Sequence, residues 1–190
     1  MRRVFDCTVA LLGLLLLSPV LVVVALGVKL TSDGPILYRA RRVGLRRTSF
    51  VLYKFRTMTH GAQGPAITPQ RDARITRFGA FLRRTKIDEL PQLLNVIRGD
   101  MALVGPRPED EAYVQYYSAN ELRVLDVRPG ITSPMSLQFR REEELLHGVD
   151  WHDRYINVIL HDKLRGELEY LQRRTFCSDL AVLLRTLRPL

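Results

Sequence analysis

The residues best suited to chemistry are two adjacent carboxylates, Asp88 and Glu89, which follow a basic cluster of Arg83, Arg84 and Lys86. A carboxylate can attack phosphorus as a nucleophile or bind a hard cation such as Mg²⁺. The neighbouring cationic groups would attract an anionic substrate. This arrangement indicates phosphate chemistry, although an Asp-Glu pair before an apolar run also commonly caps a helix.

Apolar residues recur at helical spacing directly after the acid pair, at Leu90, Leu93, Leu94 and Ile97. The pattern predicts a helix that begins at the pair, with Pro91 in the first turn, where a missing N–H costs nothing. The helix dipole would lower the pKa of both carboxylates and attract phosphate or metal. Residues 101–104 should form a short strand, and the turn after it holds Arg107 between two prolines, which would aim its guanidinium at phosphate.

The charge balance predicts an anionic partner. Of the 190 residues, 29 are Lys or Arg and 20 are Asp or Glu, which gives a formal net charge of +9. Nucleic acid, phospholipid headgroups and phosphorylated substrates would all suit this charge. The sequence has no zinc motif, dinucleotide fingerprint, P-loop or nucleophile elbow, and no recognisable nucleic-acid-binding module, so no nucleic-acid partner is expected. Its two cysteines, Cys7 and Cys177, do not suggest a disulfide and indicate a reducing compartment.

An uncharged apolar run from Cys7 to Val28 is long enough to cross a bilayer as a helix. Pro19, near its middle, removes a hydrogen bond, and the Ser18 hydroxyl can support a bend by bonding a carbonyl one turn back. Each arm of about 11 residues, or about 17 Å, would cross only half of the hydrocarbon core. We therefore predict a re-entrant helix-break-helix anchor with its break at Ser18-Pro19, which enters and leaves the membrane by the same face.

Basic residues flank this run on both sides. Arg2 and Arg3 lie before it, and Lys29 and the basic residues from Arg39 to Arg47 lie after it. A spanning helix should show a bias of Lys and Arg to one side, so two basic flanks favour a cytoplasmic position for both. A kinked spanning helix is the alternative. The predicted division is a re-entrant membrane anchor over residues 1–30 and a cytoplasmic catalytic domain over residues 31–190.

Residues 35–40 and 50–58 are predicted to form a β-hairpin with seven basic and no acidic residues from Arg39 to Arg56. Lys54 and Arg56 belong to this surface, which would contact lipid headgroups or bind phosphate. Helices are predicted over 75–84, 109–125, 141–146, 151–174 and 176–187, and an irregular segment over 133–140. The last helix is amphipathic and suits either the membrane interface or the core. The expected fold class is α+β, mostly helical, with a re-entrant anchor, a small β-hairpin and interfacial amphipathic helices.

Five segments occur in an order that is specific when taken together: an apolar N-terminus with Ser-Pro, then YKFRTM, DELPQLLNVIRGDM, LVGPRP and VRPGIT. With them the chain resembles the bacterial sugar transferase family, the monotopic phosphoglycosyl transferases, over nearly its whole length. In that family an aspartate attacks the β-phosphate of a nucleoside-diphosphate sugar, releases the nucleoside monophosphate and forms a covalent phosphosugar enzyme. A polyprenol phosphate then takes the phosphosugar, and magnesium is required.

The resemblance implies that Asp88 is the nucleophile and that Glu89 is a magnesium ligand or base. Arg83 stands where the family has a phosphate-interacting arginine, and Arg107 and Arg128 match the arginines of its PRP and RPG turns. The full phosphate-binding set expected from sequence is Arg83, Arg84, Arg107, Arg128, Lys54 and Arg56, with Asp88 and Glu89 as metal ligands.

The expected substrates are a UDP-sugar and a polyprenol phosphate, the cofactor is Mg²⁺, and the location is the cytoplasmic face of a bacterial inner membrane containing anionic lipid. Residues Ser133–Arg140 depart from the Gly-Trp-Ala-Gln-Val-Asn-Gly run of many members, so the sugar is left open, as are the glycoconjugate pathway and a homodimer. Two alternatives stand beside this reading. One is a non-catalytic basic protein that docks on anionic lipid, and the other is a bitopic protein with an extracytoplasmic domain.

Overall fold

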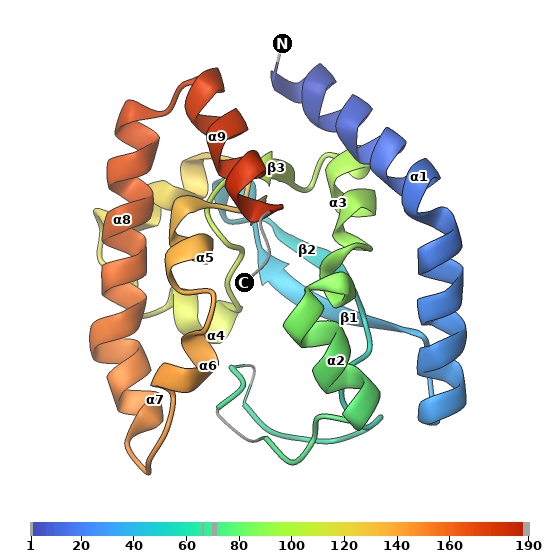
Figure 1. Ribbon diagram of the computed structural model, residues 1–190. Helices are drawn as coiled ribbons and strands as arrows, with labels where there is room; N and C mark the ends of the chain where they lie inside the picture. Colours follow the sequence, from blue (N-terminus) through green and yellow to red (C-terminus); the bar gives the residue numbers. More distant parts are fainter. Residues whose placement is uncertain (1, 66, 70–71, 188–190) are drawn as a thin grey trace.

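An antiparallel hairpin lies at the centre of the molecule, with helices on both sides of it (Figure 1). The computed structural model describes residues 2–65, 67–69 and 72–187. The hairpin consists of β1, Leu37–Val43, and β2, Ser49–Phe55, with Leu37 opposite Phe55. The predicted hairpin and the mostly helical α+β class are therefore confirmed.

Helix α1, Arg2–Thr31, continues without interruption through Pro19, so the predicted break into two helices is wrong. The Ser18 hydroxyl donates to the carbonyl of Leu15 at 2.8 Å, as expected. Because proline removes only one backbone hydrogen bond, the helix bends near its middle and does not break (Figure 1). By length and composition α1 can cross a membrane: its most apolar stretch has a mean hydropathy of 2.9 and is only 11% buried.

Both ends of α1 are fastened to the rest of the molecule. Near its start, the Arg3 guanidinium donates to the carbonyls of Ile97 at 3.0 Å and Met101 at 3.3 Å. At its other end, the guanidinium of Arg56, the residue after β2, donates to the carbonyl of Ser32 at 2.8 Å. Both ends of α1 therefore contact the same body, and the apolar side of the helix is exposed between them.

Around the acid pair the chain forms α2, η2 and α3, which span Arg77–Thr85, Ile87–Glu89 and Gln92–Arg98. The pair lies in the 3₁₀ turn η2, so the helix predicted to begin at the pair begins after it. An α-helix starting at Asp88 would need the N–H of Pro91 to bond the carbonyl of Ile87, and proline has none. That carbonyl accepts from the N–H of Leu90 instead, at 3.2 Å, which is the 3₁₀ pattern.

A parallel pair of strands positions the turn that carries Arg107. The strands are β3, Ala102–Val104, which confirms the predicted strand, and β4, Gly130–Thr132. Just beyond β3 the two backbones touch, because a Cβ on Gly130 would lie 2.1 Å from the backbone nitrogen of Gly105. The N–H of Gly130 also donates to the carbonyl of Pro106 at 2.9 Å. These contacts fix the start of the turn.

The remaining elements are η1 (Leu45–Arg47), α4 (Glu111–Val114), η3 (Glu121–Asp126), α5 (Pro134–Gln138), α6 (Glu142–Leu145), α7 (Trp151–Arg154), η4 (Tyr155–Ile159), α8 (Leu160–Arg173) and α9 (Phe176–Thr186). The single helix predicted over 109–125 is wrong, since the N–H of Ser118 bonds the Glu121 carboxylate at 2.8 Å and starts a new turn. The prediction of an irregular segment over 133–140 is also wrong, because α5 forms there. Ser133 caps α5 by accepting from the N–H of Ser136 at 2.9 Å, and Pro134 suits its first position.

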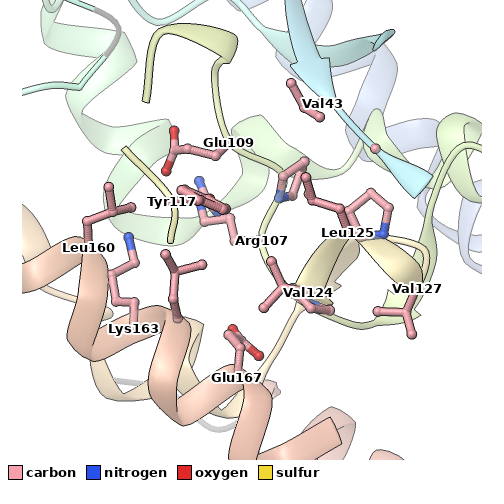
Figure 2. Close-up of a pocket in the computed structure, with 15 residues that line it drawn as sticks. Val43, Arg107, Glu109, Tyr117, Val124, Leu125, Val127, Leu160, Lys163 and Glu167 are labelled. Carbon is pink, nitrogen blue, oxygen red and sulfur yellow. The ribbon is translucent and has the colours of Figure 1, made fainter. Parts of the chain in front are cut away.

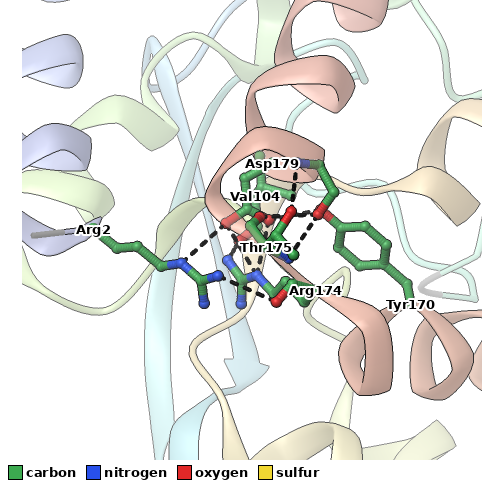
Figure 3. A network of polar contacts seen from close by, with 7 residues as sticks. Arg2, Val104, Tyr170, Arg174, Thr175 and Asp179 are labelled. Carbon is green, nitrogen blue, oxygen red and sulfur yellow. Dashed lines mark hydrogen bonds and ion pairs between the residues drawn. The ribbon is translucent and has the colours of Figure 1, made fainter.

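A polar network joins α8, α9, β3 and the start of α1 (Figure 3). Arg174 donates to Asp179 and to the carbonyl of Val104, each at 2.8 Å. Tyr170 donates to Asp179 at 2.6 Å, and Arg2 forms an ion pair with the same carboxylate at 3.5 Å. The C-terminal helices therefore hold both α1 and the strand that leads into the Arg107 turn.

Candidate active site

Asp88 is buried, with 6% of its surface exposed, and its Oδ1 has no hydrogen-bond partner among the described residues. No side chain caps η2 or α3, so Asp88 does not act as the helix cap that an Asp-Glu pair could provide. A buried carboxylate oxygen without a partner is costly, and such groups in native proteins commonly mark a functional position. Asp88 is therefore the first candidate for chemistry in this site.

Glu89 lies between two cations that come from different parts of the chain. Lys54 Nζ, from β2, is 2.9 Å from Glu89 Oε1. Arg107, from the turn after β3, places one guanidinium nitrogen 2.9 Å from Oε1 and the other 3.5 Å from Oε2. The structure thus brings together four predicted site residues, Asp88, Glu89, Lys54 and Arg107.

The two carboxylates differ in their electrostatics. Burial and the adjacent charge of Glu89 raise the pKa of Asp88 to about 6. Burial also opposes ionisation of Glu89, but the charges of Arg107 and Lys54 outweigh it and hold the pKa of Glu89 well below its usual value. The predicted lowering of both pKa values is therefore correct for Glu89 and wrong for Asp88, because the cations contact only the second carboxylate of the pair.

Asn95 of α3, which the sequence reasoning did not single out, holds β2 against the acid pair. Its side-chain oxygen accepts from the N–H of Tyr53 at 3.1 Å, and its amide donates to the carbonyl of Val51 at 2.7 Å. Asn95 is fully buried, and its backbone follows directly from the acid pair through α3. The signal that could have identified it is an asparagine inside an otherwise apolar helix, since buried amides need fixed partners. Asn95 thereby sets the position of Lys54.

The three residues of the basic cluster before the acid pair lie in three different environments. Arg83 donates to the Thr68 hydroxyl at 2.9 Å, and its charge favours ionisation of Asp88. Lys86 has a left-handed backbone, with φ 59°, and its charge acts on Asp88 in the same direction. Arg84 is exposed on α2, and the structure records no contact between it and the acid pair. Arg83 therefore stays a candidate phosphate ligand, and the structure adds nothing for Arg84.

Two predicted phosphate-binding residues lie away from the acid pair. Arg56 is only 5% exposed, and its guanidinium donates to carbonyls at the end of α1. Arg128 donates to the carbonyl of Gly99, at the end of α3, at 2.9 Å. Each guanidinium satisfies carbonyls at a helix C-terminus, where the dipole favours a cation. Both guanidinium groups therefore have partners within the fold, and the binding of phosphate by Arg56 and Arg128 stays a prediction.

The acid pair suits a cation that takes few protein ligands. The part of the chain that the structure describes contains no group of three or more His, Cys, Asp and Glu side chains able to hold a metal. Mg²⁺ keeps several waters and binds through one or two carboxylates together with substrate phosphates. The partnerless Oδ1 of Asp88 fits this mode of binding, with Glu89 beside it.

A cavity has Arg107 in its lining and contains about 490 Å³ of empty space, including the open solvent at its mouth (Figure 2). Its walls are mainly Val, Leu and Pro side chains from the tip of the hairpin, the Arg107 turn, η3 and α8. Figure 2 shows Glu167 and Lys163 reaching into it from α8, toward Arg107 and Tyr117. Burial raises the pKa of Glu167, which is 4% exposed, to about 7.

Comparisons with known proteins agree with this site. The family described as bacterial sugar transferase matches residues 1–190. A UDP-glucose:undecaprenyl-phosphate glucose-1-phosphate transferase of Caulobacter vibrioides is 38% identical over 194 residues, covering 100% of this chain and 69% of that protein. The protein of the same name in Escherichia coli K12 is 36% identical over 193 residues, covering 98% of this chain and 39% of that protein.

A third relative has a different sugar in its name. The UDP-N-acetylgalactosamine-undecaprenyl-phosphate N-acetylgalactosaminephosphotransferase of Aeromonas hydrophila is 31% identical over 200 residues, covering 100% of this chain and 43% of that protein. The chain thus spans less than half of two of these three relatives. The family match and these relatives identify a phosphoglycosyl (sugar-1-phosphate) transferase, and its long apolar helix is consistent with membrane association. The chain belongs to the bacterial sugar transferase family.

Stability should depend on pH through Glu167. The pKa of Glu167 in the folded protein, about 7, lies above the ordinary value of 4.5, so from about pH 4.5 to 7 the unfolded chain releases a proton that the folded protein keeps. The free energy of unfolding should therefore fall with rising pH in this window, by roughly 3 kcal/mol. Denaturant unfolding at pH 5 and pH 7.5 measures this. Glu167→Gln should reduce the pH dependence and leave the part that arises from the raised pKa of Asp88, and Glu169→Gln, at an exposed position on the same helix, should preserve all of it. Equal slopes in both variants would contradict the assignment.

Proposed function

We propose that this chain transfers a sugar 1-phosphate from a UDP-sugar to a polyprenol phosphate through a covalent intermediate on Asp88. The observation that carries the proposal is the buried, partnerless Oδ1 of Asp88, beside a carboxylate whose charge Lys54 and Arg107 neutralise. The names of the three relatives support the substrates, since each combines a UDP-sugar with undecaprenyl phosphate. Their sugars differ, so the donor sugar of this chain is not assigned.

In the first step, a carboxylate oxygen of Asp88 attacks the β-phosphorus of the donor. The bond from that phosphorus to the oxygen bridging the two phosphates breaks, and UMP leaves with the electron pair. In the second step, a phosphate oxygen of the polyprenol phosphate attacks the same phosphorus. The bond to Asp88 breaks, the polyprenol-diphosphate-sugar leaves, and the carboxylate is restored.

Attack by one anion on another requires that their repulsion be neutralised. Lys54 and Arg107 lie at the acid pair and can exchange contacts with Glu89 for contacts with phosphate oxygens, and Arg83 adds positive charge close by. Mg²⁺, held by Asp88 and Glu89 together with the donor phosphates, would supply further neutralisation of the diphosphate. Burial keeps water away from the acyl phosphate, which favours transfer to the prenol over hydrolysis.

The position of α1 supports a monotopic arrangement on the cytoplasmic face of a bacterial inner membrane. Residues 1–30 would form the anchor and residues 31–190 the catalytic domain. Contacts of Arg3 and Arg56 join both ends of α1 to one body, which a helix with its ends on opposite sides of a bilayer cannot do. The bend at Pro19 would let the exposed apolar side enter the membrane between these two contacts. A site on this body would then lie where a soluble donor and a membrane-bound prenol can meet.

Asp88→Asn should reduce UMP release from a UDP-sugar by about four orders of magnitude, because the amide cannot form the acyl phosphate. The fold should persist, since an amide is easier to bury than a carboxylate. UMP release with a panel of UDP-sugars measures the effect. Asp126→Asn, at an exposed aspartate, is the matched control. Turnover by Asp88→Asn close to that of the unaltered protein would rule out the covalent mechanism and favour a non-catalytic lipid-binding protein.

Chelation by excess EDTA should abolish UMP release, and added Mg²⁺ should restore it, because the diphosphate charge is then neutralised again. The melting temperature should stay unchanged, since packing and ion pairs among the described residues hold the site together without a metal. Full turnover in excess EDTA is the result that would exclude the metal.

Replacing Ser18 and Pro19 by Ala and Leu should straighten α1, because it restores one backbone hydrogen bond and removes the proline clash, a bias of about 3 kcal/mol. A straight helix of this length spans a bilayer, so residue 2 should move to the opposite face. A cysteine placed at Arg2, with Cys7 and Cys177 replaced, reports this through a membrane-impermeant thiol reagent applied to intact cells. We expect protection with Ser18-Pro19 present and labelling in the Ala-Leu variant. Labelling from outside with Ser18-Pro19 present would reject the re-entrant arrangement.

A further inference from the structure

The cavity beside Arg107 has mainly apolar walls and a polar edge. Most of its lining is apolar, as at Val124, Leu125 and Pro129. Such walls suit the face of a flat ring better than a sugar, which needs hydrogen bonds on many sides.

Glu167 provides an acceptor in this cavity. Its Oε1 accepts from the Ser133 hydroxyl, and its Oε2 is buried without a partner among the described residues. The ammonium group of Lys163, one turn away on α8, is committed to Glu142 at 2.6 Å and does not bond Glu167. Glu167 lines the cavity, and a buried carboxylate oxygen without a partner can accept from an N–H or O–H donor of a ligand that reaches it.

Two further groups relate the cavity to the reaction. Tyr117 lines it, and its hydroxyl makes no hydrogen bond within the part of the chain that the structure describes, so it can donate to a ligand oxygen. Arg107 lines the cavity as well and also contacts Glu89. A molecule in the cavity would therefore share Arg107 with the acid pair, where the proposed function places the diphosphate.

We propose that this cavity is the subsite for the uracil ring of the donor, with Glu167 Oε2 accepting from the ring N3–H and Tyr117 donating to a ring carbonyl. Uracil presents a donor between two acceptors along one edge, which complements a carboxylate oxygen beside a hydroxyl. Apolar walls cover its faces. The inference rests on the proposed function, because it assigns one end of the nucleotide donor.

The test is equilibrium binding of UMP and 3-methyluridine 5′-monophosphate to the full chain in lipid nanodiscs, measured by calorimetry at pH 8, where Glu167 is ionised. The methyl group removes the N3–H and fills the space in front of the acceptor. The unaltered protein should bind the methylated ligand at least about tenfold more weakly, since a buried acceptor is left unpaired.

Glu167→Leu, which removes the acceptor and keeps similar bulk, should reduce this preference below about threefold. Glu169→Gln, at an exposed position two residues away, should retain it in full. A merely structural role of Glu167 in holding Ser133 would not change the preference between two ligands that differ at one ring position. Should Glu167→Leu fail to fold, the unaltered protein still decides the matter, because equal binding of the two ligands overturns the proposal.

Another outcome would also overturn it. If Glu167→Leu keeps the preference for UMP but raises the KM for UDP-glucose, the cavity receives the sugar. Failure of the proposed function can be told apart, since UMP binding requires no turnover. Discrimination between the two ligands without UMP release from any UDP-sugar would refute the transferase and preserve the uracil subsite. UMP release without discrimination between the two ligands would support the transferase and refute the uracil subsite.

Discussion

Two adjacent carboxylates cannot both carry charge in a buried site unless cations compensate them, and the architecture of this protein follows from that constraint. Removing a charged group from water costs several kcal/mol, and only close, well-placed partners offset it. Lys54 and Arg107 each lie 2.9 Å from the same oxygen of Glu89. Glu89 thereby holds two cations in place, and Asp88 keeps an oxygen free. The hairpin, the acid-pair turn and the Arg107 turn must all meet at this point.

Strand β2 connects this site to the membrane helix. Lys54 lies in β2, and Arg56 follows directly after the end of the strand. One binds Glu89 and the other binds the carbonyls at the end of α1. Asn95 fixes the same strand from the other direction through the backbone of Tyr53. Contacts from β2 and from the residue after it therefore connect the acid pair with the end of α1.

Sequence reasoning located the acid pair, the hairpin and Arg107, because short motifs record residue types that phosphate chemistry requires. It could not show that Arg56 and Arg128 bond carbonyls near helix ends, since an arginine that binds phosphate and one that caps a helix end look alike until the fold shows which helix ends there. It also expected α1 to break at Pro19, where local chemistry allows a bend as well. Glu167 and Asn95 escaped notice because their roles depend on partners distant in the chain, Ser133 and β2.

The contacts that fasten α1 have a consequence for biosynthesis. The helix precedes every segment that holds it, from Arg56 through Ile97 to Asp179, so a ribosome delivers the apolar helix long before its partners exist. The rest of the body then assembles against α1, and it closes late, through contacts of large sequence separation that form slowly. Chains cut short before α9 would leave the start of the helix without its last partner.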